Sequence, residues 1–286
     1  MSLMRQMWFG TRQYCQWIKV HSPGSGYESM GYSERLEYLN GGLGVRTSFD
    51  AHRELTLTWN AVREEEARTV SDYAFGQYGT GYVYLVDPVS AGLNALNRQW
   101  AAPGLATMDA PPLAGDERPQ RVPNANQAWG YPADMAQYTV AIGDQRRTFF
   151  TPIPPGHVAW VGVHGDPASS LGIAVQAVSA GVNIGSPTIV PVSGVNSATR
   201  VTHQFSPAGQ QRGIELSIED GDGTITLAGV VVQILPAGVA PKTGRFISGQ
   251  GQGGMTFEDK PLVTPSSLIH NQYGMSVKLA EVEPWE

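Results

Sequence analysis

The most informative stretch of the sequence is residues 49–103, which read FDAHRELTLTWNAVREEEARTVSDYAFGQYGTGYVYLVDPVSAGLNALNRQWAAP. Over Glu54–Trp59 the large apolar residues alternate with polar ones, which is the period-two pattern of a half-buried strand. Leu55, Leu57 and Trp59 are therefore predicted to face a core.

A short helix is predicted after this strand. Asn60 is a candidate N-cap, and Glu64–Glu66 place negative charge where the positive end of a helix dipole would lie. Glycines between Gly76 and Gly81 end the helix, and a second strand is predicted over Tyr82–Val86. Nothing in the stretch is arranged for catalysis, so its signals favour a structural protein over an enzyme.

Composition favours an all-β protein with many turns. The chain has 286 residues with 34 Gly and 20 Pro, and only 15% of its residues are charged, against a usual value of about 25%. Low charge also fits a subunit whose surface is covered by neighbours. The formal net charge is -6 and no basic run is present, so duplex DNA or other nucleic acid is not an expected partner.

The single cysteine, Cys15, excludes a disulfide within the chain and a cysteine-based zinc site. It lies in an apolar stretch that is predicted as a strand, so a packed thiol is favoured over a reactive one. No secretory signal and no membrane span are expected, because no apolar run approaches about 18 residues.

Two domains are predicted, with one large β domain as the alternative. Prolines cluster between Ala102 and Pro132 and indicate extended connecting chain, so the boundary is placed to give domains 1–103 and 104–286. In the first domain, residues 22–32 are rich in Gly and Ser and are predicted as a loop, with a strand expected at Arg35–Leu39.

The second domain reads as short strands at 8–12-residue spacing, which is typical of a β-sandwich or barrel. The clearest hairpin is predicted from Gly213–Glu219 and Thr224–Leu235, with Asp220-Gly221-Asp222-Gly223 as its turn. Asp220 and Asp222 also resemble the opening of a calcium loop. The twelfth position is Val231 instead of glutamate, so a hairpin turn is favoured over a bound cation.

Other candidate sites are weak. His157 and His164 lie an odd number of residues apart on one predicted strand, so they should not share a metal. The glycine-rich Gly249–Gly254 has no helix pattern after it and is predicted as a flexible loop rather than a phosphate cradle. The acidic residues form no recognisable pair for glycoside hydrolysis, although one is not excluded. No cofactor is expected.

Several motifs resemble minor tail proteins of long-tailed phages that infect actinobacteria, of the distal tail protein type. The similarity covers most of the chain, best in the first hundred and the last forty residues. It rests on the following residues: Trp8-Phe9-Gly10, Phe49-x-x-His52-x-x-Leu55-x-Leu57-x-Trp59, Tyr78-Gly79-x-Gly81-x-Val83-Tyr84-x-Val86-Asp87-Pro88, Asn94-x-Leu96, Trp100-Ala101-x-Pro103, Gly251-Gln252-Gly253-Gly254-Met255-x-Phe257 and Val277-x-Leu279-x-Glu281-Val282-x-Pro284-Trp285.

The resemblance implies an N-terminal β domain that forms a six-membered ring at the end of the tail tube. It also implies a C-terminal β-sandwich, galectin-like or similar to a carbohydrate-binding module with a jelly-roll fold. The implied partners are further copies of the chain, the tail tube protein, the tape measure protein, and the hub with other minor tail proteins. The implied location is the tail tip or baseplate of the virion, after synthesis in the host cytoplasm.

Two functions follow from this reading. The first is a structural subunit of the tail tip, for which Trp59, Tyr82, Tyr84 and Trp100 are expected to be core or interface anchors. The alternative is binding of a host cell-surface glycan through residues 104–286, where aromatic rings of a sandwich could stack on sugars. The two functions can coexist in one chain.

Overall fold

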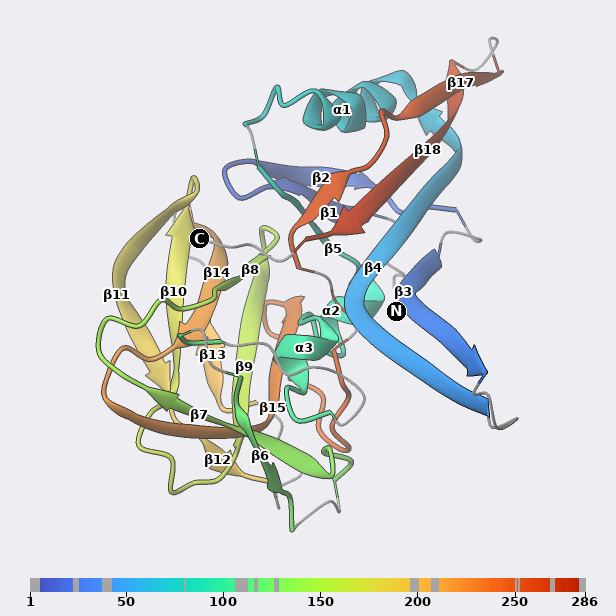
Figure 1. Ribbon diagram of the computed structural model, residues 1–286. Coiled ribbons are helices and arrows are strands. Elements are labelled where there is room, and N and C mark those ends of the chain that lie inside the picture. Colours follow the sequence, from blue (N-terminus) through green and yellow to red (C-terminus); the bar gives the residue numbers. More distant parts are fainter. Residues whose placement is uncertain are drawn as a thin grey trace.

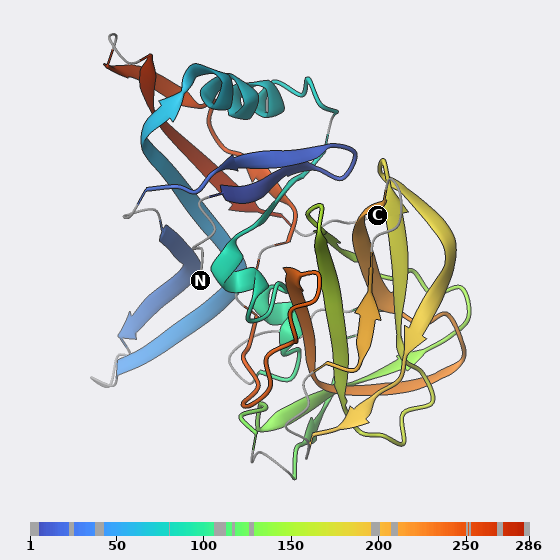
Figure 2. The same ribbon diagram turned by 180° about the vertical axis from the view of Figure 1, so that it is seen from behind.

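The computed structural model describes residues 6–22, 26–37, 43–79, 81–105, 113–115, 118–125, 129–195, 201–206, 211–249, 251, 253–267 and 271–282. They form two β-rich bodies side by side (Figures 1 and 2). The all-β class with a helix in the first part is confirmed. Two further four-residue helices, α2 (Pro88–Ala91) and α3 (Arg98–Ala101), follow the second predicted strand.

The first body is built on one eight-stranded sheet with the order β2-β1-β5-β16-β18-β4-β3, and β17 pairs with β18. Its strands are β1 (Gln6–Thr11), β2 (Cys15–Lys19), β3 (Gly26–Glu37), β4 (Leu43–Arg63), β5 (Val83–Val86), β16 (Met255–Phe257), β17 (Leu262–Ser267) and β18 (Gln272–Glu281). The alternation predicted for Glu54–Trp59 is present in β4, where Leu55, Leu57 and Trp59 are buried.

Helix α1 (Glu64–Ala74) lies on this sheet and closes its core. Its N-cap is Arg63 and not the predicted Asn60, because β4 continues through Val62 and Arg63 to pair with β18. The glutamates at Glu64–Glu66 do occupy the first turn, as the dipole argument requires. Tyr73 is the last buried residue of the helix. Its ring contacts that of Phe9 edge-on, with 5.3 Å between the ring centroids.

The second body is a sandwich of two sheets. One has the order β11-β10-β14-β8; the other has the order β12-β9-β15-β7-β6, with β13 paired to β9. The strands are β6 (Gln120–Pro123), β7 (Asp134–Val140), β8 (Phe149–Pro152), β9 (His157–Gly165), β10 (Ile173–Ser179), β11 (Val182–Val190), β12 (Ser193–Gly194), β13 (His203–Phe205), β14 (Gln211–Ile218) and β15 (Gly223–Pro236).

The predicted hairpin between β14 and β15 is wrong, although both strands exist. β14 pairs with β10 and β8 in one sheet, whereas β15 pairs with β9 and β7 in the other. The turn therefore carries the chain across the sandwich. This arrangement lets the apolar face of Leu216 and Ile218 meet that of Ile225 and Leu227 across the core, whereas a hairpin would place them in a single sheet.

The predicted division at residue 103 also needs correction. β16 and β18 lie between β5 and β4 in the sheet order, so residues 253–267 and 271–282 belong to the first body. The sandwich is thus an insertion between two segments that share one sheet. Strand periodicity in the sequence does not contain this information, because it identifies strands and not their neighbours.

Candidate assembly surface and inter-domain junction

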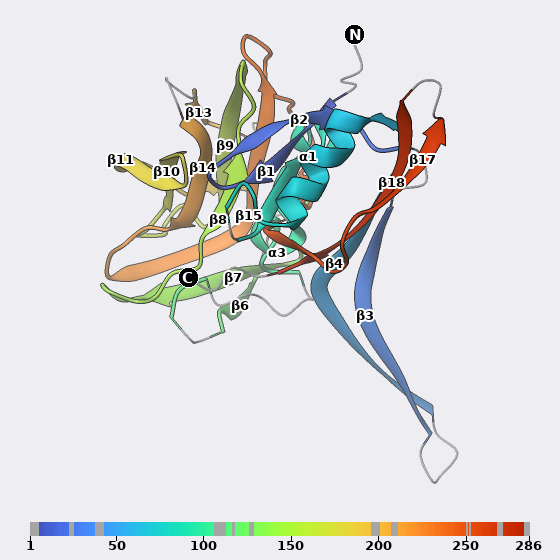
Figure 3. The same ribbon diagram turned by 90° about the horizontal axis from the view of Figure 1, so that it is seen from above.

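The candidate surface begins with a two-stranded ribbon, which we define as residues 29–37 of β3 and 43–53 of β4. It projects away from both bodies (Figure 3). The two strands pair with each other from Ser29↔Arg53 to Glu37↔Leu43, whereas β18 pairs with β4 only from Glu54 onward. At about 3.3 Å per residue, the ribbon is about 30 Å long.

Within the part of the chain that the structure describes, both long edges of the ribbon lack a strand partner. An isolated two-stranded ribbon is marginally stable in water, and unpaired edges are templates for pairing with another chain. The ribbon is therefore the candidate assembly surface. The predicted loop at residues 22–32 is wrong over most of its length, because β3 begins at Gly26.

The four predicted anchors lie in different places. Trp59 is 2% exposed in the core of the first body, and its indole Nε1 donates to the Lys19 carbonyl at 2.8 Å. Tyr84 and Trp100 are also buried, but they face the sandwich: Tyr84 meets Phe150 of β8 edge-on, and Trp100 lies beside Phe149. Tyr82 is half-buried beside Tyr84. Their role in assembly stays a prediction.

Asn94 fixes the α2–α3 segment to the sandwich and was not identified from its residue type. Its side chain is fully buried and makes four hydrogen bonds. Nδ2 donates to the carbonyls of Val230 (3.0 Å) and Ile247 (3.1 Å), and Oδ1 accepts from the backbone N–H of Val232 (3.0 Å) and Leu96 (3.3 Å). Asn94 thereby satisfies backbone groups of β15, in the way that a neighbouring strand would.

The predicted flexible loop at Gly249–Gly254 is instead packed where the structure describes it, at Gly249, Gly251, Gly253 and Gly254. A Cβ atom on Gly249 would clash with the carbonyl oxygen of Leu96, and one on Gly251 with that of Ala95. Gly251 N–H donates to the Leu96 carbonyl at 3.0 Å. The glycines are thus required for close approach of two backbones, not for flexibility.

A carboxylate completes this part of the junction. Glu281 of β18 is 6% exposed, and its Oε1 accepts from Gly253 N–H at 2.7 Å and from Asn97 Nδ2 at 3.1 Å. Asn97 also caps α3 through its Oδ1, which accepts from Trp100 N–H. The C-terminal strand, the glycine loop and the α2–α3 segment are therefore tied at one point.

An ion pair forms a second junction. Arg12, in the turn between β1 and β2, pairs with Glu215 of β14 and donates to Asn183 Oδ1 of β11 at 2.8 Å. Its guanidinium also lies 5.6 Å from the centroid of the Phe150 ring. Glu215 is 7% exposed, and its carboxylate is engaged in holding the two bodies together.

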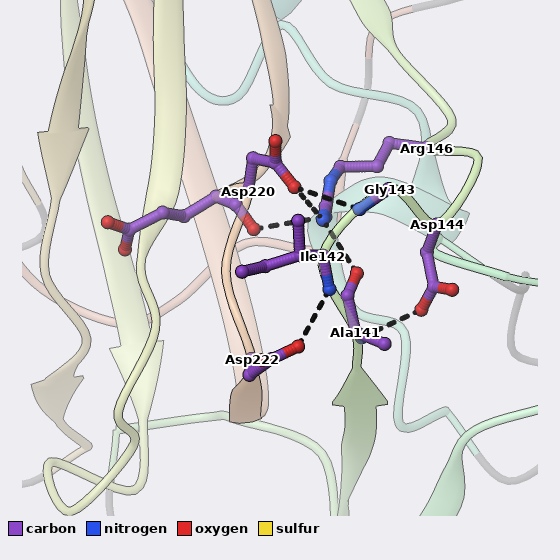
Figure 4. A network of polar contacts seen from close by, with 8 residues as sticks. Ala141, Ile142, Gly143, Asp144, Arg146, Asp220 and Asp222 are labelled. Atoms are coloured by element: carbon purple, nitrogen blue, oxygen red, sulfur yellow. Dashed lines mark hydrogen bonds and ion pairs between the residues drawn. The ribbon is translucent and has the colours of Figure 1, made fainter.

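Asp220 and Asp222 tie two loops together (Figure 4). Asp220 Oδ1 accepts from Arg146 at 2.6 Å, and Asp222 Oδ1 accepts from Ile142 N–H at 2.8 Å. Arg146 also donates to the carbonyl of Glu219 at 3.0 Å. Both carboxylates therefore hold the crossing turn against the loop that follows β7.

The histidines and the cysteine are dispersed. His164 is buried beside Tyr131, His157 packs on Trp17, and Cys15 is buried with its Sγ donating to the Thr11 carbonyl. Among the described residues, no group of three or more His, Cys, Asp and Glu is placed to hold a metal ion. No helix in these residues is long and apolar enough to cross a membrane.

The chain matches no protein-family model, no curated protein and no solved structure.

Proposed function

We propose that the protein is a structural subunit of a phage tail tip, where copies of the chain assemble into a ring that joins the tail tube to the hub and adhesion apparatus. The observation that carries this proposal is the projecting ribbon of β3 and β4. The sequence motifs that resemble distal tail proteins supply the expected ring of six and the expected partners. These are the tail tube protein, the tape measure protein and other minor tail proteins.

Ring formation needs a heterologous contact, in which one surface of a copy meets a different surface of the next. A ribbon with two unpaired edges suits this task, because backbone N–H and C=O groups on each edge can pair with a strand of the neighbouring copy. The junctions at Asn94, Glu281 and Arg12 support the same reading. They hold the two bodies in one orientation, as a subunit that transmits geometry along a tail would need.

The test is to shorten the ribbon in the full chain. Replacing residues 30–52 by Asn-Gly joins Ser29 to Arg53 through a two-residue turn that suits a hairpin. The rest of the sheet keeps its pairing, so the variant should fold. Light scattering over a range of concentrations should show that the unaltered chain climbs toward a hexamer while the shortened chain remains a monomer.

The control is Leu262→Ser on β17, a strand whose Leu262 is 67% exposed and lies outside the ribbon. This variant should assemble like the unaltered chain. Equal assembly of the shortened and unaltered chains would refute a role for the ribbon. Negative-stain images of the assembled fraction of the unaltered chain would count the subunits in each ring.

A further inference from the structure

A cavity opens into the end of the sandwich between its two sheets, and it is separate from the ribbon and both junctions. It has a volume of about 220 Å³. Residues of β10, β11 and β14 line one side, and residues of β13 line the other, together with Ile153 after β8. Figure 1 shows β13 beside the sheet of β10, β11 and β14.

The floor of the cavity is apolar. Ile153 and Ile214 are each 2% exposed and belong to the sandwich core. Ala177 pairs with Ile214 across β10 and β14, so the two side chains share the inner face of their sheet. Phe205 of β13 is half-buried and packs against the same core. A ligand in this cavity would therefore meet carbon atoms and an aromatic ring on one side.

Polar groups lie at the mouth, on the inner faces of both sheets. Thr188 of β11 pairs with Val175, which is a core residue, so Thr188 is on the inner face of its sheet. His203 is two residues from Phe205 on β13 and therefore shares its face. The His203 ring contacts the Thr202 hydroxyl through Nδ1 at 2.9 Å, which fixes the ring with Nε2 on its other side.

Thr188 is exposed and His203 is half-buried, so both side chains can hydrogen-bond to a ligand at the mouth of the cavity. The walls contain no lysine, arginine or carboxylate side chain among the described lining residues. This excludes ion pairing as the main attraction. Sites for drug-sized ligands are roughly 300–1,000 Å³, so this smaller cavity suits one small ring.

We propose that this cavity binds one neutral hydroxylated ring of hexose size. The apolar C–H face of such a ring would lie over Ile214 and Phe205, and its hydroxyl groups would reach Thr188 and His203. This assignment does not depend on the ring-forming role, since the cavity lies within the sandwich and the ribbon is not part of it. It locates the predicted glycan-binding alternative at one place in residues 104–286.

The experiment is saturation-transfer difference NMR on the full chain. The probes are methyl glucoside, methyl galactoside and N-acetylglucosamine, each at millimolar concentration. Mannitol, an open-chain polyol, tests whether ring shape matters, and hexanoate tests whether the cavity simply takes an aliphatic chain. At least one cyclic sugar should give a signal with a Kd in the millimolar range, as expected for a small ligand of modest efficiency.

Two variants locate the binding. Ala177→Leu fills the cavity from the inner face of its sheet. The larger side chain displaces the sugar ring from its apolar contacts, so sugar binding should weaken at least tenfold. Thr188→Ala removes one hydrogen-bonding hydroxyl and should weaken binding about three- to tenfold. Thr139→Ala, an exposed threonine on β7, is the matched control and should leave binding unchanged.

Absence of signal from all three cyclic sugars would overturn the proposal, as would binding of hexanoate or mannitol without them. Sugar binding that survives both Ala177→Leu and Thr188→Ala would also overturn it, because the ligand would then lie elsewhere. If Ala177→Leu fails to fold, the comparison of Thr188→Ala with Thr139→Ala decides the question by itself.

Discussion

Replacing Asn94 by leucine should lower the free energy of unfolding by about 4–6 kcal/mol. The change keeps roughly the side-chain volume but removes all four hydrogen bonds of the buried amide. It leaves two backbone carbonyls and two backbone N–H groups without that partner. Each unsatisfied buried group costs about 1–3 kcal/mol, and the longest of the four bonds, at 3.3 Å, should contribute least.

The assay is thermal and urea unfolding of the full chain, followed by tryptophan fluorescence. For a chain of this size each kcal/mol corresponds to about 2 °C, so the loss should lower Tm by about 8–12 °C. Asn94→Ala should cost somewhat less, because the space it opens can admit water to the same backbone groups. Asn60→Leu is the control, since Asn60 is exposed and should change stability by about 0.5 kcal/mol or less.

A loss of about 1 kcal/mol or less for Asn94→Leu would refute the reasoning. It would mean that the backbone of β15 finds other partners and that the Asn94 amide does not fix the α2–α3 segment to the sandwich. A loss confined to one of two separate unfolding transitions would refute a different part. Residues of both bodies belong to one buried cluster, so a single cooperative transition is expected.

Gly251→Ala should destabilise the protein by about 3 kcal/mol, because the added Cβ would meet the Ala95 carbonyl. Gly185→Ala should cost only about 1 kcal/mol, because Gly185 lies in open space at φ 69°. Urea unfolding gives the free energy of unfolding of both variants. Trp59→Ala should cost about 3–5 kcal/mol and Trp59→Phe less in the same assay; a native-like midpoint for Trp59→Ala would show that the side chain is not in the core. Fragment 1–103 should fail to fold, as judged by circular dichroism, because it lacks β16 and β18; a cooperative, folded fragment would contradict the sheet order. Burial raises the pKa of Tyr138 above its ordinary value of 10.0, so its contribution to stability is present below pH 10 and is lost as the pH rises further. Urea midpoints should therefore fall above pH 10, and fall less in Tyr138→Phe; equal slopes in the two proteins would rule this group out.

Local patterns were reliable guides to single elements. The alternation around Trp59 identified the buried half of β4, and the three glutamates identified the first turn of α1. The helix start was misplaced by a few residues because Asn60 is a good N-cap in isolation. Its position is decided by β18, which pairs with β4 as far as Arg63 and delays the helix.

The candidate assembly surface was harder to predict. Residues 22–32 contain glycine and serine, which are poor strand formers, so local preference indicated a loop. In the folded chain, β3 forms there because β4 provides a long partner strand. Strand preference depends on the neighbour across the sheet, and a single sequence does not identify that neighbour.

The all-β class, many of the strands and the existence of a helix after β4 follow from residue periodicity along the chain, and the sequence alone predicts them. Tertiary structure decided which strands are neighbours, how the bodies are joined and what individual polar and glycine residues do. Asn94 and Gly251 illustrate the difference. Asn94 bonds to the carbonyl of Val230, which is 136 positions away along the chain, and Gly251 bonds to the distant carbonyl of Leu96. Only folding brings these backbone groups within hydrogen-bonding distance.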